Sequence, residues 1–171
     1  MRSTIKIVIL LFFICISMSG ASFPDMEKYM RQHALIWEQL PMQWNEGAFL
    51  GNGLVGMMVY ADSTLNALVF HLGRPDVTDH RKAPYRKTSI GTEEADKMVD
   101  FCRLDVGKML LFPEGKILSG TFYLDIYNAE LTGHLKTDKG DLTFHAYTPQ
   151  PEEVNIVEVS SGVPYRWKGI P

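Results

Sequence analysis

From residue 118 onward, apolar and polar residues alternate with the two-residue period of β-strands. The stretch 118–127 places leucine, phenylalanine and isoleucine on one face and serine, threonine, tyrosine and aspartate on the other. The same alternation returns over 131–136 and 142–147, and a β-rich run follows at 154–159. Residues 138–140, Asp-Lys-Gly, are typical of a hairpin turn, with Gly140 free to adopt a positive φ. Short strands joined by turns, with no helices between them, predict an antiparallel sandwich or barrel.

Two more strands are predicted at 54–61 and 65–72, on either side of the turn residues 62–64. A short helix is expected at 92–101, because Thr92 can act as its N-cap and two glutamates follow in the first turn. The polar stretch 74–91 carries two prolines and no periodicity, which indicates a long loop. The predicted fold is therefore mainly β: an antiparallel β-sandwich, supersandwich-like and incomplete, with one short helix.

The N-terminus has the order of a secretory signal peptide. Arg2 and Lys6 precede an uncharged apolar run, and small residues follow it. Cleavage is expected after Ala21, so that 1–21 form the signal peptide and 22–171 the β-sandwich domain. The apolar run is too short for a permanent anchor, which predicts export to the periplasm or the extracellular space and no membrane attachment after cleavage. The alternative is a buried N-terminal strand.

Composition narrows the possible chemistry. Removal of the predicted signal peptide takes away Arg2 and Lys6, which changes the formal net charge from −3 to −5. An acidic chain without basic clusters gives no reason to expect a nucleic-acid partner. Only Cys102 would remain, so no internal disulfide can form. The five histidines show no metal-ligand spacing. We therefore expect neither a metal nor a cofactor.

The glycine spacing at 51–56 is the one motif that suggests a nucleotide site. Gly51, Gly53 and Gly56 have the G-x-G-x-x-G spacing, and Asp76 follows about twenty residues later. A dinucleotide-binding turn needs a buried strand before the glycines and a helix after them. The sequence predicts no strand upstream and a strand downstream, so no helix N-terminus would meet a pyrophosphate. The glycines instead predict a tight approach of backbone leading into the sheet.

The same glycines carry a resemblance to a known family. Trp37, Pro41 and the stretches 44–62, "WNEGAFLGNGLVGMMVYAD", and 68–79, "LVFHLGRPDVTD", resemble the start of the N-terminal β-sandwich domain of certain multidomain glycoside hydrolases. The most similar group is the family 95 α-L-fucosidases and their bacterial relatives. Residues 103–159 look like the middle of the same domain. Leu54 stands where the fucosidases usually carry a basic residue, and 70–79 replace their Asn/Asp-rich loop, which favours an uncharacterised relative.

The resemblance implies a larger parent enzyme. In this family the sandwich is followed by an (α/α) toroid that carries the catalytic carboxylates. This chain is expected to be truncated before that toroid, a missing C-terminal partner, so it should be inactive by itself. No catalytic residue is carried over. The carbohydrate is expected to be a partner through the parent enzyme.

Candidate substrate-binding residues lie in or near the long loop predicted at 74–91. Glu46, Asp76 and Asp79 are carboxylates of the type used in glycoside hydrolysis, which requires two of them facing one another. Trp44 is a possible stacking platform for a sugar. The competing interpretation is that Asp76 and Asp79 cap turns in a polar loop, Asp79 with Arg81 as its pair, and that Trp44 packs on the edge of the sandwich.

Three functions are compatible with these features. The first is a non-catalytic accessory domain of an exported glycoside hydrolase. The second is a free-standing carbohydrate-binding sandwich that uses exposed aromatic residues: Trp44, Tyr123, Tyr127, Tyr147 and Trp167. The third is a structural or interaction domain without a ligand.

Overall fold

The computed structural model describes residues 25–78 and 104–171. The predicted signal peptide, the predicted helix at 92–101, Cys102 and most of the loop 74–91, Asp79 included, lie outside the described residues. The chain divides into two units at His33. The described part of the first unit is the helix α2 (Met26–Arg31), which the sequence analysis did not predict. Asp25 caps it by accepting the Lys28 N–H at 3.2 Å.

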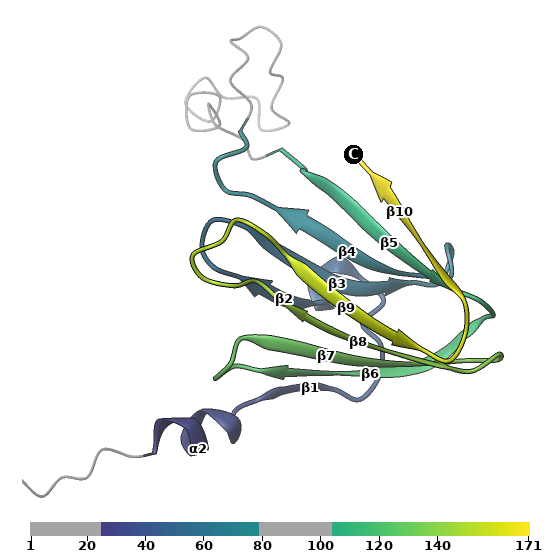
Figure 1. The fold of residues 1–171 in the computed structure, drawn as a ribbon, viewed down its shortest axis with the longest axis horizontal. Helices are drawn as coiled ribbons and strands as arrows, with labels where there is room; N and C mark the ends of the chain where they lie inside the picture. The colour runs from purple at the N-terminus through teal and green to yellow at the C-terminus, as the bar shows by residue number, and fades with distance from the viewer. Residues whose placement is uncertain (1–24, 79–103) are drawn as a thin grey trace, which may run out of the picture. The chain divides into compact units, whose positions relative to one another are not determined.

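The second unit contains two five-stranded antiparallel sheets, which confirms the predicted mainly-β sandwich. Figure 1 shows the last two strands joined by a short turn, from which each runs into a different sheet. The first sheet, sheet A, has the order β1 (Leu35–Trp37), β6 (Ile117–Asp125), β7 (Glu130–Thr137), β8 (Asp141–Tyr147) and β9 (Ile156–Ser161). The second, sheet B, has the order β10 (Tyr165–Ile170), β5 (Gly107–Pro113), β4 (Ala67–Gly73), β3 (Gly56–Asp62) and β2 (Ala48–Gly51).

A row of aromatic rings forms the centre of the core. Trp37, Phe122 and Phe144 come from sheet A, and Phe70 and Trp167 from sheet B; neighbouring ring centroids in this row lie 5.4–6.5 Å apart. Phe70, Phe122 and Phe144 are each at most 2 % exposed. Gly133 of β7 makes room for this row, because a Cβ at that position would clash with the Phe144 ring. Burial of these rings against each other holds the two sheets together.

The two-residue alternation is confirmed along most of sheet A. Over β7 and β8 every second residue is buried. The predicted turn at 138–140 joins these strands, and Gly140 has φ +151°. Two positions of β6 deviate: Leu118 was expected on the buried face but is 57 % exposed, and Asp125 was expected on the polar face but is only 6 % exposed. The pairing of β6 with β7 shifts register between Ile117 and Ser119, so Leu118 is an extra residue at a bulge and leaves the alternation.

Sheet B departs more from the sequence prediction. The strands predicted at 54–61 and 65–72 correspond to β3 and β4, and Asp62 closes their turn by accepting N–H groups of Thr64 and Leu65. The prediction of no strand before the glycines was wrong, because β2 occupies that place. It is only four residues long and is held by antiparallel pairing to β3. A strand this short has too few residues to show a period of its own.

Candidate functional site

The glycine motif forms the turn between β2 and β3. Gly53 has φ +91°, a conformation that favours glycine. A Cβ on Gly56 would lie 2.7 Å from the Leu50 carbonyl oxygen, so the two strands approach too closely for a side chain. Because a strand, and no helix, follows these glycines, the turn lacks the helix N-terminus that binds a pyrophosphate. The predicted strand after the glycines is confirmed.

Asn52, at the centre of the motif, fixes this turn and ties it to the other sheet. Its Oδ1 accepts the N–H groups of Leu54 and Val55, both at 3.0 Å. Its Nδ2 donates to the carbonyl oxygens of Pro149 and Glu152, at 3.0 and 2.8 Å. Both acceptors belong to the loop between β8 and β9, so one side chain connects a turn of sheet B with a loop of sheet A.

Two further amides strengthen this connection. Gln150 Nε2 donates to the Asn52 carbonyl oxygen at 2.6 Å, and Asn155 Nδ2 donates to the Gly56 carbonyl oxygen at 3.3 Å. We call this end of the sandwich the glycine-turn end. Residues 51–56, 73–76 and 148–155 meet there. Asn52 was not among the residues predicted to be functional, although an Asn between two glycines is a signal for a side chain that bonds its own turn.

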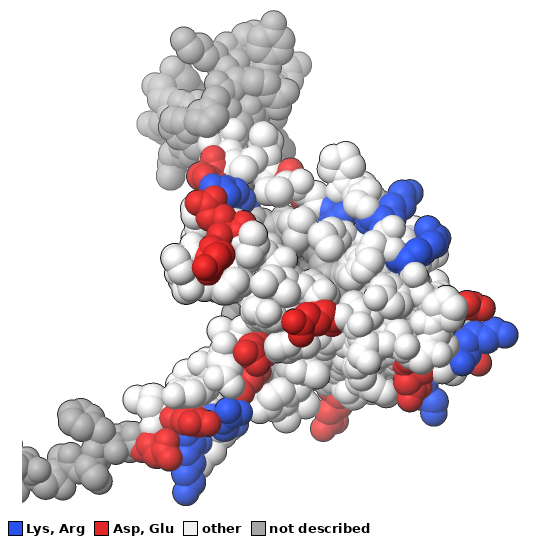
Figure 2. Space-filling view, in the orientation of Figure 1, with Lys and Arg blue, Asp and Glu red and all other residues white. Residues whose placement is uncertain are grey.

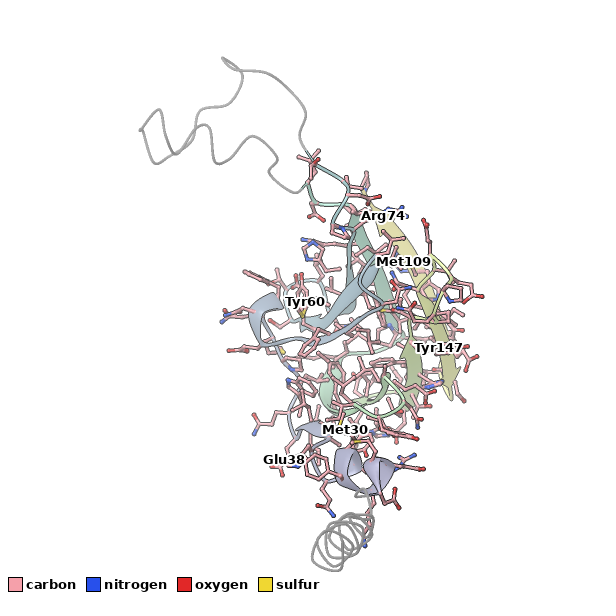
Figure 3. The ribbon with its side chains drawn as sticks, turned by 90° about the vertical axis from the view of Figure 1, so that its left-hand side faces the viewer. Met30, Glu38, Tyr60, Arg74, Met109 and Tyr147 are labelled. Atoms are coloured by element: carbon pink, nitrogen blue, oxygen red, sulfur yellow. The ribbon has the colours of Figure 1, made fainter. Side chains whose placement is uncertain are left out.

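Arg74 joins two carboxylates at the glycine-turn end. Its Nε lies 2.7 Å from Asp76 Oδ1, and its Nη1 lies 2.6 Å from Glu153 Oε2. A second bond, Nη2 to Asp76 Oδ2 at 3.0 Å, makes the Asp76 contact bidentate. Figure 3 shows Arg74 in the segment that leaves β4, and Figure 2 shows red acidic side chains gathered around a blue one at this end.

The protonation of Asp76 follows from this geometry. The Arg74 hydrogen bonds lower the pKa of Asp76 below its ordinary value, and the same contact raises the pKa of Arg74. Asp76 is therefore an ionised hydrogen-bond acceptor that already has a partner. Beside it, a shallow cavity of about 370 Å³ lies between the glycine turn, Pro75 and Leu104.

The other predicted site residues lie elsewhere. Trp44 and Glu46 belong to the short 3-10 helix η2 (Trp44–Glu46), which immediately precedes β2. Trp44 is 63 % exposed, and the Glu46 carbonyl oxygen accepts the indole N–H of Trp37 at 2.9 Å. Asp76 follows β4 at the other end of sheet B, beside the glycine turn, where Gly73 pairs with Gly56. The structure therefore does not bring Trp44 and Glu46 together with Asp76, and Asp79 lies outside the described residues.

The outer face of sheet A carries a second group of polar and aromatic side chains. Tyr123 is 38 % exposed, and Tyr147 stacks beside His145 with ring centroids 5.1 Å apart. The His145 ring lies between two carboxylates, with Nε2 3.2 Å from Glu130 and Nδ1 3.4 Å from Glu158. A broad sheet face with tyrosines and hydrogen-bonding groups is suited to stacking against sugar rings.

The outer face of sheet B carries another ionisable group. His71 Nε2 lies 2.8 Å from Asp105 Oδ1, and this bond lowers the pKa of Asp105. The same oxygen accepts the Gly107 N–H at 3.0 Å, so Asp105 also anchors the start of β5. Burial raises the pKa of nearby Tyr60, with Asp62 and Asp105 adding to the effect. Figure 3 shows Tyr60 and Tyr147 on different sides of the ribbon.

Across residues 25–78 and 104–171, no group of three His, Cys, Asp or Glu side chains is arranged to hold a metal ion. In the same residues, no helix has the length and apolarity needed to cross a bilayer. No known family model matches the chain, and no curated protein matches it.

Proposed function

We propose that this chain is a non-catalytic β-sandwich domain of an exported glycoside hydrolase that acts on glycans, with the hydrolysis of O-glycosidic bonds carried out by the parent enzyme. The resemblance points to an α-L-fucosidase as the parent enzyme. The observation that carries the non-catalytic assignment is the Arg74 contact with Asp76 and Glu153.

Hydrolysis of a glycosidic bond needs one carboxyl group that keeps its proton near neutral pH, and this requires a raised pKa. Arg74 has the opposite effect on Asp76, because its hydrogen bonds stabilise the ionised form. The two carboxylates therefore connect loops at the glycine-turn end. This arrangement supports a structural role for the loop that was predicted to carry substrate-binding residues.

The non-catalytic assignment is tested with a panel of 4-nitrophenyl glycosides that includes the α-L-fucoside. The purified chain should release nitrophenol no faster than buffer does, and Asp76→Asn and Glu153→Gln should give the same result. The assignment would be overturned if the native chain released nitrophenol faster than buffer and Asp76→Asn released it more slowly than the native chain.

The link to a parent enzyme is tested on the messenger RNA that encodes the chain. We expect the coding sequence of a helical catalytic module in the same reading frame or in an adjacent cistron. A transcript that encodes this chain without any hydrolase would contradict the parent-enzyme part of the proposal.

A free-standing carbohydrate-binding domain is the second candidate, and the outer face of sheet A favours it. Tyr123 and Tyr147 there stand beside His145 and threonines that can bond to hydroxyl groups. If this face binds glycans, Tyr123→Ala should weaken retention on an insoluble polysaccharide. Tyr29→Ala, which removes an exposed tyrosine of α2, should leave it unchanged.

A further inference from the structure

Three turns meet at the end of sheet B opposite the glycine turn, and they enclose a pocket. They are the β3–β4 turn, the β5–β6 turn and the β9–β10 turn. Asn66 connects the first two: its Nδ2 donates to the Gly115 carbonyl oxygen at 2.8 Å, and its Oδ1 accepts the Ile117 N–H at 2.9 Å. The Glu114 N–H donates to the Pro164 carbonyl oxygen at 2.7 Å, which connects the third.

The pocket has a volume of about 540 Å³, within the range of small-molecule sites. Its apolar lining includes Leu65, Phe112 and Pro164, and its charged lining is Glu114 and Arg166. Because the three turns are hydrogen-bonded to one another, the pocket is held open without a ligand. Binding of a ligand would therefore cost little free energy for ordering the protein.

Arg166 is the distinctive group of this pocket. Its guanidinium carbon lies 4.1 Å from the centroid of the Phe112 ring. Within the described residues, no carboxylate lies at ion-pair distance from Arg166. The stacked guanidinium is therefore oriented by the ring, while its N–H groups remain available to an anion.

Neighbouring residues extend the positive charge along the same face. Strand pairing places Arg166 opposite Phe112 and Lys168 opposite Leu110, and Lys108 opposite Ile170. These three cations therefore share the outer face of β5 and β10. Figure 2 shows blue side chains gathered along these strands. In a chain of net charge −3 this is a local concentration of positive charge.

The lining indicates the chemistry of a matching ligand. A carboxylate would form a bidentate pair with the Arg166 guanidinium. Hydroxyl groups would donate to Glu114, and an apolar ring face would contact Leu65 and Pro164. A hexuronic acid residue of a glycan has all three features, whereas a neutral hexose lacks the first.

We propose that this pocket is a binding subsite for hexuronate residues of acidic glycans, with Arg166 as the residue that recognises the carboxylate. The proposal rests on the proposed function in taking a glycan as the ligand. It extends that function by naming the class of glycan.

The test is a calorimetric titration of the full chain with tetra-galacturonate and, for comparison, with neutral tetra-galactose. We expect the uronate oligomer to bind and the neutral one to bind at least about tenfold more weakly. Arg166→Gln should weaken uronate binding at least about tenfold, and Arg166→Lys should weaken it less, because the charge remains and the bidentate geometry is lost.

The matched control is Lys28→Gln, which removes one positive charge from an exposed position of α2. It should leave uronate binding unchanged. Thermal unfolding of each variant establishes that it is folded before titration.

Three results would overturn the subsite. They are equal binding of both oligomers, equal loss of binding in Arg166→Gln and Lys28→Gln, and no heat of binding at millimolar uronate. Each of them leaves the proposed function standing if the transcript encodes a hydrolase. Conversely, a negative outcome of the transcript test or the glycoside test would contradict the proposed function without changing the result of this titration.

Discussion

Arg74 shows how one side chain decides the role of two carboxylates. Asp76 lies in the same loop, but Glu153 belongs to the loop between β8 and β9, 79 residues along the chain. Only the folded chain brings Glu153 to the guanidinium. With Arg74 in place Asp76 remains ionised, and an ionised carboxylate cannot act as a proton donor.

The pKa of Asp76 is the measurable consequence. In Arg74→Gln, the pKa of Asp76 should rise toward its ordinary value, because the hydrogen bonds that lower it are lost. Carboxyl-carbon chemical shifts followed through a pH titration measure this. Lys136→Gln removes the same charge at another surface and should leave that pKa where it is. An unchanged pKa in Arg74→Gln would show that the pair does not form in solution.

The sign of the pH effect on stability follows. Since the pKa of Asp76 is lower in the folded than in the unfolded chain, the pair contributes to the free energy of unfolding above the ordinary carboxyl pKa. That contribution is lost as the pH falls through the lowered value. Asp76→Asn should therefore differ from the native chain at neutral pH and match it in strong acid.

At the scale of elements, the β2–β3 turn depends on Asn52. Its side chain makes four hydrogen bonds, two within the turn and two to the β8–β9 loop. Sequence context is sufficient for the first two, because Asn commonly bonds the backbone of its own turn. The other two require sheet A and sheet B to be packed together.

Removal of this side chain should destabilise the whole sandwich. Asn52→Ala is expected to lower the free energy of unfolding by about 2 kcal/mol, because several partly buried backbone groups lose their partners. Urea denaturation measures this.

Asn45→Ala is the matched control. Asn45 is an exposed residue of η2, and its truncation should change the unfolding free energy by less than about 0.5 kcal/mol. An Asn52→Ala variant as stable as this control would refute the connecting role of Asn52.

At the scale of the whole sandwich, the aromatic row ends at Trp167. Its ring lies 5.4 Å from Phe70, which itself is fully buried and packs edge-on against Phe144 of the other sheet. Trp167 is nevertheless 38 % exposed, and Met109, on the same face of sheet B, is 36 % exposed. The last two strands of sheet B therefore cover the core incompletely.

Trp167 should still contribute to stability through this contact. Trp167→Ala is expected to lower the free energy of unfolding by about 2 kcal/mol, less than for a fully buried tryptophan because part of the ring already faces solvent.

Trp44→Ala is the matched control, since Trp44 is 63 % exposed, and it should have an effect below about 0.5 kcal/mol. Equal effects of the two substitutions on chemical denaturation would show that the aromatic row does not extend to β10.

The sequence predicted the parts of this fold that local pattern controls. The alternation over β7 and β8, the Gly140 turn and the absence of a helix after the glycines all depend on a few consecutive residues. The strand β2 escaped prediction because four residues show no period. Leu118 was misplaced because a bulge depends on the register with the partner strand.

The candidate site was less accessible to sequence reasoning. Trp44, Glu46 and Asp76 were grouped because they were predicted to lie near the loop at 74–91, yet strand pairing places Asp76 and the 3-10 helix η2 at opposite ends of sheet B. The turn residues that enclose the Arg166 pocket are spread over three separate turns. No local pattern relates them.

The sequence by itself determined the class of fold and the meaning of the glycines, because strand period, turn composition and the residues that follow a motif are local properties. Only the tertiary structure decided that Arg74 pairs with Glu153, that Asn52 joins the two sheets, and that Arg166 stacks on Phe112. These contacts join segments separated by tens of residues. Their partners depend on strand order and register, which are set by the burial of the common core.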